Sequence, residues 1–274
     1  MGCRLAGCWF LGLKISAMHS KNIPKFHLEG QVVLVTGSSR GLGKAIAFAL
    51  GDAGAKVALN YWNDSATANG TLAKFKAAGY AGEMFRGNVI DETDVNRMCG
   101  EIVAKLGPID TLVINATPDQ PHKPIEEYDW AFHQSMLDFF VKSPFLLTRA
   151  TLAHMKEQRH GHIINITSEV FHRGVGNFSP YVAAKGAQIG WTRSMAMELA
   201  PWNITVNAVA PGWIPVERHA NDAQSDKDGY ETLIPMGNFG TPSDVGGAVV
   251  FLASDAARFI TGQSIHVNGG TTVY

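Results

Sequence analysis

Short apolar runs rich in β-branched residues alternate with amphipathic stretches along most of the chain. The apolar runs predict buried strands at residues 31–36, 56–61, 80–86, 110–115, 163–168, 204–210 and 264–267. Apolar positions at helical spacing predict helices at residues 42–50, 65–78, 91–106, 125–158, 181–200 and 243–253. This alternation predicts an α/β fold, with a doubly wound parallel sheet of about seven strands between two layers of helices.

Such a three-layer αβα arrangement is a Rossmann fold, and its ligands bind at the carboxyl ends of the strands. Local signals support the helix boundaries. Asp91 is expected to cap the helix at 91–106, and Thr241 or Ser243 the helix at 243–253. Pro144 is expected to kink or interrupt the 125–158 stretch. The segment at 211–240 reads as long, polar and rich in glycine and proline.

The first 27 residues do not follow this pattern. They contain a second methionine, Met18, and a Leu-Ala-Gly-Cys sequence that ends at Cys8 without the preceding apolar stretch of a signal peptide. We therefore expect residues 1–27 to be an N-terminal extension, either disordered or the product of an upstream start site. Residues 28–274 are expected to form a single domain.

Composition narrows the possible partners and location. The 274 residues are 46% apolar, which is enough for one large core. With 23 basic and 24 acidic residues and no basic tract, we expect no nucleic-acid partner. No apolar run approaches the ~18 residues of a membrane span, so we expect no membrane insertion. The three cysteines are few and odd in number, which fits the reducing cytoplasm.

Neither the cysteines nor the histidines predict a metal site. The cysteines, at positions 3, 8 and 99, have no metal-ligand spacing. His154, His160 and His162 lie close together in the sequence, but their spacing matches no common ligand set. We expect these three histidines at a solvated helix end.

Tyr181 and Lys185, preceded by Ser168, are the main candidates for catalysis. Residues four apart on a helix lie on one face, and a cation beside a phenol lowers its pKa from about 10. Such a tyrosine can exchange a proton with an alcohol oxygen near neutral pH. Ser168, at the carboxyl end of a strand, can hydrogen-bond the same oxygen. The pair alone is common, and an ordinary amphipathic helix would also explain it.

A glycine-rich turn near the N-terminus predicts a dinucleotide site. The strand at 31–36 runs directly into Gly37, Gly41 and Gly43, and a helix follows. The glycines permit a tight turn and close backbone approach, and the helix N-terminus offers free N–H groups to a pyrophosphate. A glycine-rich run alone is a weak signal, but this one lies between the right elements and precedes a proton-transfer pair.

With these motifs the chain resembles the short-chain dehydrogenase/reductase family over about residues 28–270, in particular its 3-oxoacyl-acyl-carrier-protein reductase-like and glucose dehydrogenase-like members. The matching motifs are Thr36-Gly37-x-x-x-Gly41-x-Gly43, Asn115-Ala116, Ser168, Tyr181, Lys185, Pro211-Gly212, Ile260-Thr-Gly-Gln263 and Val267-Asn-Gly-Gly270.

The resemblance implies hydride transfer between a nicotinamide and a carbonyl or secondary alcohol. Tyr181 would be the general acid or base, Lys185 would lower its pKa and hold the nicotinamide ribose, and Ser168 would orient the carbonyl. A homotetramer, joined partly through residues 248–267, is also implied. The expected cofactor contacts are Gly37, Ser39, Arg40, Gly41, Leu42, Gly43, Tyr61, Asn88, Val89, Asn115, Ala116, Tyr181, Lys185, Pro211, Gly212 and Ile214.

The end of the second strand and the glycine turn favour NADP(H). Enzymes that use NAD carry an acidic residue near the end of this strand, but residues 60–63 contain no carboxylate. Asp64 reads as the N-cap of the next helix. Arg40, inside the glycine turn, suits a 2′-phosphate. NAD(H), with Arg40 as a solvated loop charge, is the alternative.

Three positions depart from the family's pattern. Thr117 follows Ala116 where the family has glycine, which reshapes the loop beside the nicotinamide ribose. Phe140 replaces an asparagine that carries a water for proton relay. Val216 replaces a threonine that bonds the carboxamide, although the backbone of Ile214 could still do so. We expect slower turnover, or a relay through another group.

The substrate is expected to contact Glu169, His172 and Trp213. With Glu217 and Arg218 nearby, the residue types indicate a polar small molecule such as a sugar or polyol-like alcohol. Alternatively, these charges face solvent or pair with each other. A long acyl-carrier substrate is the other family option, but no basic docking patch supports it.

A catalytically weak or inactive sensor or scaffold that binds the nicotinamide cofactor is the alternative function. The three departures support it, and the intact serine, tyrosine and lysine oppose it. An isomerase or dehydratase that retains its nicotinamide is a further alternative.

Overall fold

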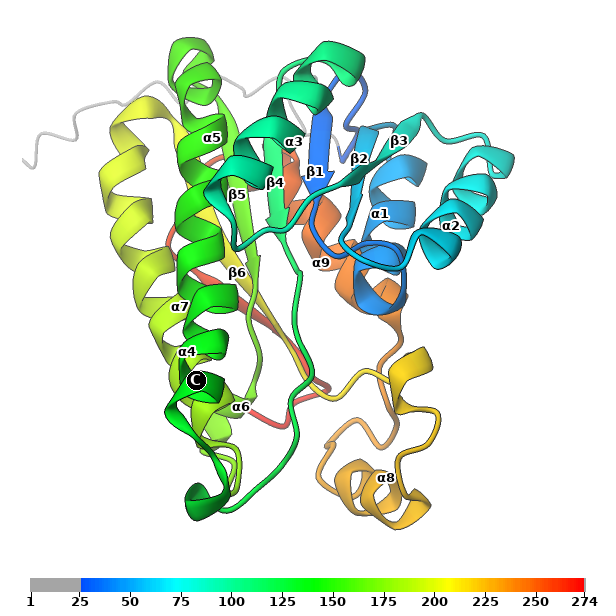
Figure 1. The fold of residues 1–274 in the computed structure, drawn as a ribbon, viewed down its shortest axis with the longest axis vertical. Coiled ribbons are helices and arrows are strands. Elements are labelled where there is room, and N and C mark those ends of the chain that lie inside the picture. The colour runs from blue at the N-terminus through cyan, green and yellow to red at the C-terminus, as the bar shows by residue number, and fades with distance from the viewer. Residues whose placement is uncertain (1–25, 274) are drawn as a thin grey trace, which may run out of the picture.

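Seven parallel strands form one sheet in the part of the chain that the structure describes, residues 26–273. The structure is a computed structural model, and the expected N-terminal extension lies, apart from residues 26–27, outside the described part. The strand order is β3-β2-β1-β4-β5-β6-β7. The order reverses between β1 and β4, which makes the crevice there the topological switch point of a doubly wound sheet. The predicted fold class and strand number are confirmed (Figure 1).

The strands follow the predicted apolar runs. They are β1 (Val32–Val35), β2 (Lys56–Tyr61), β3 (Gly82–Arg86), β4 (Thr111–Ile114), β5 (Gly161–Ile166), β6 (Ile204–Pro211) and β7 (Ser264–Val267). Strand β3 begins later than expected because Tyr80 belongs to the preceding turn, where its ring packs on Phe75. Strands β1, β4, β5 and β6 are buried along their whole length, as expected where helices cover both faces of a parallel sheet.

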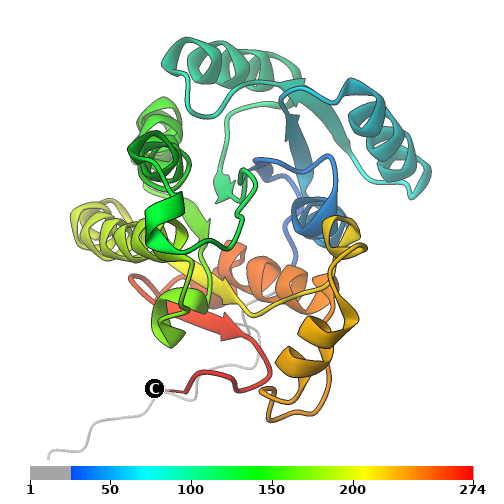
Figure 2. The ribbon, with the colours of Figure 1, turned by 60° about the horizontal axis from the view of Figure 1, so that its bottom comes forward.

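Helices cover both faces of the sheet (Figures 1 and 2). The helices are α1 (Gly41–Asp52), α2 (Ser65–Ala77), α3 (Glu92–Leu106), α4 (Trp130–Leu137), α5 (Ser143–Gln158), α6 (Val170–Arg173), α7 (Ser179–Leu199), α8 (Gln224–Glu231) and α9 (Pro242–Ala253). Helices α1, α2 and α9 contribute to one apolar core, and α3, α5 and α7 to the other. None of the helices within residues 26–273 is long and apolar enough to cross a membrane.

The predicted helix signals act as expected. Asp91 caps α3 by accepting a hydrogen bond from the N–H of Asp94 at 2.8 Å. Thr241 and Asp244 form a capping box at the start of α9. Pro144 lies in the first turn of α5, directly after a π-helical segment at Asp138–Lys142. Proline has no N–H to donate to the carbonyl four residues earlier, so the α-helical ladder is interrupted there.

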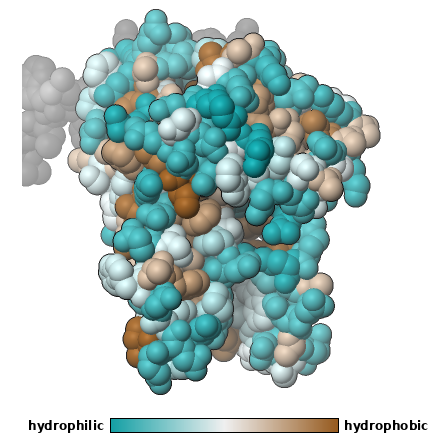
Figure 3. Space-filling view, viewed as in Figure 1, coloured by the Kyte–Doolittle hydropathy of each residue, from teal (hydrophilic) through white to brown (hydrophobic). Residues whose placement is uncertain are grey.

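Two helices at the carboxyl ends of the strands were not predicted. Helix α6 follows β5, and α8 lies inside the 211–240 segment that was expected to be irregular. Helix α8 has no buried residues and therefore no apolar periodicity in the sequence. The region of α4 and α6 and the region of α8 project beyond the strand ends, and the surface is hollowed between them (Figures 1 and 3).

Candidate active site

The glycine turn between β1 and α1 has the shape that a phosphate cradle requires. Gly37 and Gly41 have positive φ values of 61° and 59°, which side chains disfavour. A Cβ on Gly43 would lie 2.3 Å from the carbonyl oxygen of Gly37 and 2.4 Å from Nδ2 of Asn115. A Cβ on Gly37 would lie 2.8 Å from Cα of Ala116. The turn therefore fits tightly against the end of β4.

Two asparagine side chains hold this turn in place. Asn60, inside β2, accepts a hydrogen bond from the N–H of Gly37 at 3.0 Å and donates to the carbonyl of Gly87 at 3.0 Å. Asn115 donates to the carbonyls of Thr36 at 3.0 Å and Gly37 at 3.1 Å. Sequence reasoning missed Asn60, although a polar residue in an otherwise apolar strand could have revealed it. These contacts preorganise the turn, and the residues present fit a dinucleotide.

The end of β2 lacks a free carboxylate. As predicted, Asp64 caps α2, and its carboxylate accepts from the N–H of Thr67 at 2.9 Å. Hydrogen bonds from Thr67, helped by the charge of Arg40, lower the pKa of Asp64. Arg40 itself is exposed and close enough to act on this helix terminus. Arg86, which sequence reasoning missed, stacks on Trp62 at 4.8 Å from the ring centroid.

The remaining predicted cofactor residues lie along the same edge of the sheet. Leu42 packs against the core beneath the turn, and the carbonyl of Ser39 accepts from Thr71 at 2.6 Å. Tyr61 ends β2. Asn88 forms the turn after β3, where its side chain accepts from the N–H of Ile90 at 3.2 Å. The others are Val89 and Ile214, which are buried, and Pro211 and Gly212 at the end of β6.

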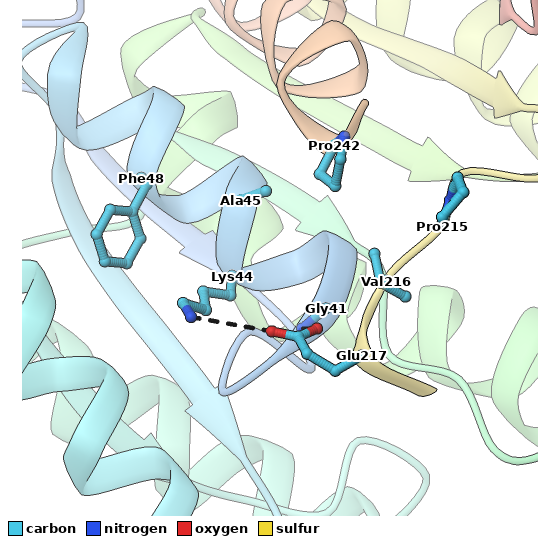
Figure 4. A pocket seen from close by; sticks show the side chains of 8 residues that line it. All are labelled: Gly41, Lys44, Ala45, Phe48, Pro215, Val216, Glu217 and Pro242. Atoms are coloured by element: carbon cyan, nitrogen blue, oxygen red, sulfur yellow. Dashed lines mark hydrogen bonds and ion pairs between the residues drawn. The ribbon is translucent and has the colours of Figure 1, made fainter. Parts of the chain in front are cut away.

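A carboxylate from the loop after β6 touches the start of α1. Glu217 accepts a hydrogen bond from the N–H of Gly41 at 3.1 Å and lies 3.9 Å from Nζ of Lys44 (Figure 4). With Phe48, Val216 and other residues it lines a cavity of about 370 Å³. Helix N-termini attract anions, so Glu217 is bound where a helix favours negative charge, rather than beside Ser168 or Tyr181.

The three predicted catalytic side chains meet at the carboxyl end of β5. Ser168 follows β5, and its hydroxyl accepts a hydrogen bond from the N–H of Val170 at 3.3 Å. Tyr181 and Lys185 lie on successive turns of α7. Ser168 is near enough to Tyr181 to act on the pKa of its phenol. The structure thus brings together the residues that the spacing placed on one side of the sheet.

Lys185 is buried and makes three contacts that define its direction. Its Nζ donates to the carbonyl of Ile166 at 2.7 Å and to Oε1 of Gln188 at 3.1 Å. The same atom lies 3.7 Å from the ring centroid of Phe140, a cation–π contact. Sequence reasoning missed Gln188, although its position three residues after Lys185 on the helix could have indicated the contact. Phe140 thus offers Lys185 an aromatic face.

The pKa values differ from the expectation. Burial raises the pKa of Tyr181, while Arg218 and, more weakly, Ser168 act in the opposite direction. Burial, with a smaller effect of Arg218, holds the pKa of Lys185 well below its usual value. The pKa of Tyr181 is therefore raised rather than lowered, and Arg218 is the cation that acts to lower it. Nζ of Lys185 lies 5.5 Å from the centroid of the Tyr181 ring.

Glu169, expected at the substrate, is instead enclosed by protein groups. Only 2% of its surface is exposed. It accepts hydrogen bonds from Nη1 of Arg173 at 2.8 Å, from the hydroxyl of Tyr230 at 2.7 Å and from the hydroxyl of Thr271. Glu169 thus pairs with Arg173, a residue that was not among the charged side chains expected at the substrate. Tyr230 carried no local signal in the sequence.

The other two expected substrate residues have different surroundings. The N–H of Trp213 donates to the hydroxyl of Tyr230 at 2.8 Å, and its ring packs on Tyr230 and Phe239. The ring of His172 packs against His266 of β7 at 4.6 Å between centroids. The structure therefore places Trp213 with α8 and His172 with the edge of the sheet.

The expectation of three solvated histidines is wrong for one of them. His162 lies on β5, 2% exposed, where its Nδ1 is 2.8 Å from Oγ1 of Thr205. Burial lowers its pKa to about 4. Cys99 is also buried, and burial raises its pKa to about 11. Among residues 26–273, no group of three or more His, Cys, Asp or Glu side chains could hold a metal ion.

Known proteins resemble this chain over most of its length. Residues 37–272 match the family model described as enoyl-(acyl carrier protein) reductase. The chain is 42% identical over 241 residues to the 3-oxoacyl-(acyl-carrier-protein) reductase FabG of Staphylococcus aureus, which covers 86% of this chain and 96% of that protein. Its counterpart in Aquifex aeolicus is 40% identical over 249 residues, covering 89% and 98%.

Solved structures agree with these relatives. A gluconate 5-dehydrogenase from Burkholderia cenocepacia, solved in complex with NADP and tartrate, matches with a TM-score of 0.84 and 31% identity over 90% of this chain and 97% of that one. The fold, the glycine turn and the Ser168, Tyr181 and Lys185 arrangement fit the same assignment. The chain belongs to the short-chain dehydrogenase/reductase family of nicotinamide-dependent oxidoreductases.

Proposed function

We propose that this enzyme reduces the carbonyl group of a small polar substrate with NADPH, and catalyses the reverse oxidation of the alcohol, with Tyr181 as the proton-transfer group. The observation that carries the proposal is the position of Tyr181 and Lys185 on successive turns of α7, with Nζ of Lys185 bonded to the carbonyl of Ile166 at the end of β5, directly before the Ser168 loop. When bound, the nicotinamide supplies or accepts the hydride. The residues of the protein bind the cofactor, orient the substrate carbonyl and protonate its oxygen.

Each catalytic residue has a role that its surroundings support. Tyr181, whose pKa is raised, stays protonated at neutral pH and can donate its proton to the oxygen that gains charge during reduction. Ser168 orients that oxygen by hydrogen bonding. Lys185, one turn further along α7, holds the nicotinamide ribose. Arg218 stabilises negative charge that develops at Tyr181.

The charge distribution at the end of β2 supports NADPH over NADH. Arg40 is exposed at the glycine turn, and the carboxylate of Asp64 is occupied as a helix cap. A 2′-phosphate would find a guanidinium there and no free carboxylate to repel it. The related gluconate 5-dehydrogenase was solved with NADP, which is consistent with this choice.

For the substrate, the relatives suggest two classes. The relatives at about 40% identity reduce 3-oxoacyl groups on acyl carrier protein, as their names state, and a structural neighbour acts on gluconate. We favour a small polar substrate because Arg218 acts on Tyr181 from the loop after β6 and can bind a hydroxyl or carboxylate. We further propose a homotetramer located in the cytoplasm, and sedimentation velocity at micromolar concentration tests the assembly.

A nicotinamide sensor with little turnover is the second candidate, favoured by one observation. Phe140 lies against Lys185 and has no polar group to hold a relay water. The two candidates differ in whether the absorbance of the cofactor changes stoichiometrically with substrate.

The first experiment is a fluorescence titration with NADPH and NADH, followed by a substrate panel monitored at the nicotinamide absorbance. The panel contains small keto acids, sugar-derived ketones and a 3-oxoacyl thioester. We expect Tyr181→Phe to retain NADPH affinity within about twofold and to lose roughly 10²–10⁴ in kcat. NADPH binding without turnover of any compound would favour the sensor, and turnover by Tyr181→Phe close to that of the wild type would exclude the proposed proton-transfer role.

A further inference from the structure

Glu169 connects four segments that are far apart in the sequence. It directly follows Ser168, and it receives hydrogen bonds from Arg173 in α6, Tyr230 in α8 and Thr271 after β7. Its carboxylate is 2% exposed, so these protein groups replace the water that would otherwise solvate the charge. A carboxylate satisfied in this way is unsuited to be a direct substrate ligand, because a ligand would have to displace one of its donors.

Tyr230 extends this network to the wall of the site. Its hydroxyl donates to Glu169 at 2.7 Å and accepts from the N–H of Trp213 at 2.8 Å. Its ring stacks on Phe239 at 5.6 Å between centroids and packs edge-on against Trp213 at 5.4 Å. Arg173 lies over the same ring at 5.3 Å. One tyrosine thus fixes α8, the backbone of Trp213 and an aromatic cluster relative to Ser168.

Gly212 leaves the space that this hydroxyl occupies. A Cβ at position 212 would lie 2.6 Å from the hydroxyl oxygen of Tyr230. Burial and the hydrogen bond to Glu169 raise the pKa of Tyr230 far above neutrality, so the hydroxyl keeps its proton over any practical assay range. Tyr230 therefore remains a hydrogen-bond donor to Glu169 throughout that range.

The contact between Tyr230 and Glu169 matters because the rest of α8 is poorly buried. Helix α8 has no buried residue, and it belongs to the projection that borders the hollow beside the active site (Figure 3). Apart from the ring contacts of Tyr230, α8 contributes no residue to the apolar cores, and elements with few apolar contacts open at low free energy. Hydrogen bonds at Tyr230 therefore contribute a large share of what keeps α8 and Trp213 in place.

We propose that Glu169 is a positioning residue that, through Tyr230 and Thr271, holds α8 and Trp213 in the conformation that binds substrate. This deepens the proposed function and rests on it, because the consequence concerns substrate affinity. Loss of the connection is expected to weaken substrate binding, with little effect on the chemical step or on the cofactor.

The test compares Tyr230→Phe with a matched control, Tyr80→Phe. Both tyrosines donate to a carboxylate, and Tyr80 donates to Asp52 at 3.1 Å, away from the site. We expect Tyr230→Phe to raise KM about tenfold, as for the loss of one buried hydrogen bond to a charged group. Its kcat and NADPH Kd should stay within about threefold of the wild type. The control should leave all three constants unchanged.

A second set of variants guards against misfolding and tests the coupling. Glu169→Gln keeps the shape, but its amide has one acceptor oxygen where the carboxylate has two, so KM should also rise. In the double variant with Tyr230→Phe, the increase should be smaller than the product of the single effects, because both remove the same contact. Thr271→Ser keeps the hydroxyl and should retain a normal KM, whereas Thr271→Val should not.

Hydrogen exchange gives a measurement that needs no turnover. We expect amides of α8 to exchange at least about tenfold faster in Tyr230→Phe than in the wild type or in Tyr80→Phe. Unchanged α8 exchange would overturn the proposal, as would an unchanged KM or a fall in kcat alone. If the wild type turns over no substrate, the proposed function fails, and the exchange result still decides whether Glu169 positions α8.

Discussion

The two sides of the active site are held by different means. On the cofactor side, the glycine turn is fixed by the chain itself, through positive φ values and short side chains such as Asn60 and Asn115 that bond to backbone atoms. On the substrate side, α8 and Trp213 depend on side chains that converge on one buried carboxylate, Glu169. The first arrangement leaves little freedom to move or to vary, whereas the second can be altered by a single side chain.

This difference separates binding a common cofactor from selecting a particular substrate. A dinucleotide site needs N–H groups at fixed positions, which only the backbone of a tight turn supplies. A substrate wall needs a shape that suits one molecule, and side chains from a loosely packed helix can provide it. We therefore expect changes on the cofactor side to abolish binding and changes on the substrate side to alter affinity.

The largest effect is expected for Gly43→Ala. Its Cβ would overlap the Gly37 carbonyl oxygen at 2.3 Å and the amide of Asn115 at 2.4 Å. Backbone atoms cannot yield without opening the turn, so we expect a loss of about 1–3 kcal/mol in the free energy of unfolding and of more than about 100-fold in NADPH affinity. Denaturant unfolding and fluorescence titration measure the two quantities.

Gly70→Ala is the matched control for this prediction. Gly70 lies in α2, and its Cβ would meet no atom within 4 Å. We expect this variant to be more stable by about 0.5–1 kcal/mol, since alanine favours a helix interior. Normal NADPH binding by Gly43→Ala would show that the turn is more adaptable than its contacts suggest.

The second-largest effect is expected on the cofactor side, for a substitution that changes the preference between NADPH and NADH. Arg40→Gln removes the exposed cation beside the cap of α2, and we expect NADPH affinity to fall roughly 10–100-fold while NADH affinity stays constant. Paired titrations with both nucleotides measure this. Arg86→Gln is the comparison, because Arg86 is stacked on Trp62. A larger loss of NADPH affinity in that variant would make Arg86 the phosphate-binding residue.

Gln188→Leu tests the lysine between the two sides. It removes the side chain that accepts from Lys185 at 3.1 Å, which makes the buried ammonium harder to maintain and lowers its pKa further. We expect kcat to fall about tenfold with KM for substrate nearly unchanged. Steady-state kinetics across pH measure this effect, with the exposed Gln134→Leu as control. An unchanged kcat would mean that Ile166 and Phe140 suffice to hold Lys185.

The sequence alone revealed the cofactor side much better than the substrate side. The glycine turn, the cap at Asp64 and the positions of the strands along the chain follow from local rules, because each is encoded by residues adjacent in the chain. Tyr181 and Lys185 were found in the same way, from their spacing on one helix. The direction of the Lys185 side chain was not, since it depends on Ile166 and Phe140 from other elements.

The substrate side was misjudged for a physical reason. Glu169 was expected to face the substrate because charge beside a catalytic serine is unusual, but its partners Tyr230 and Thr271 are 61 and 102 residues away in the sequence. Helix α8 has no buried face and so left no apolar pattern. Contacts of this kind arise only when the sheet brings the ends of its strands together.

The smallest effect is expected for Glu217→Gln. This side chain belongs to the loop on the substrate side but contacts the cofactor side. Glu217 comes from the loop after β6, yet its carboxylate bonds the N–H of Gly41 at the start of α1 and lies near Lys44. A negative charge there competes with a dinucleotide phosphate for the same helix terminus. Removing it should raise NADPH affinity about threefold at low salt, with a smaller gain at high salt because exposed charges are screened. Glu101→Gln, which removes a similarly exposed charge from α3, should have no effect. Weaker NADPH binding in Glu217→Gln would instead mean that Glu217 orders the loop after β6 for cofactor binding. A residue of the substrate side would then contribute to the cofactor site.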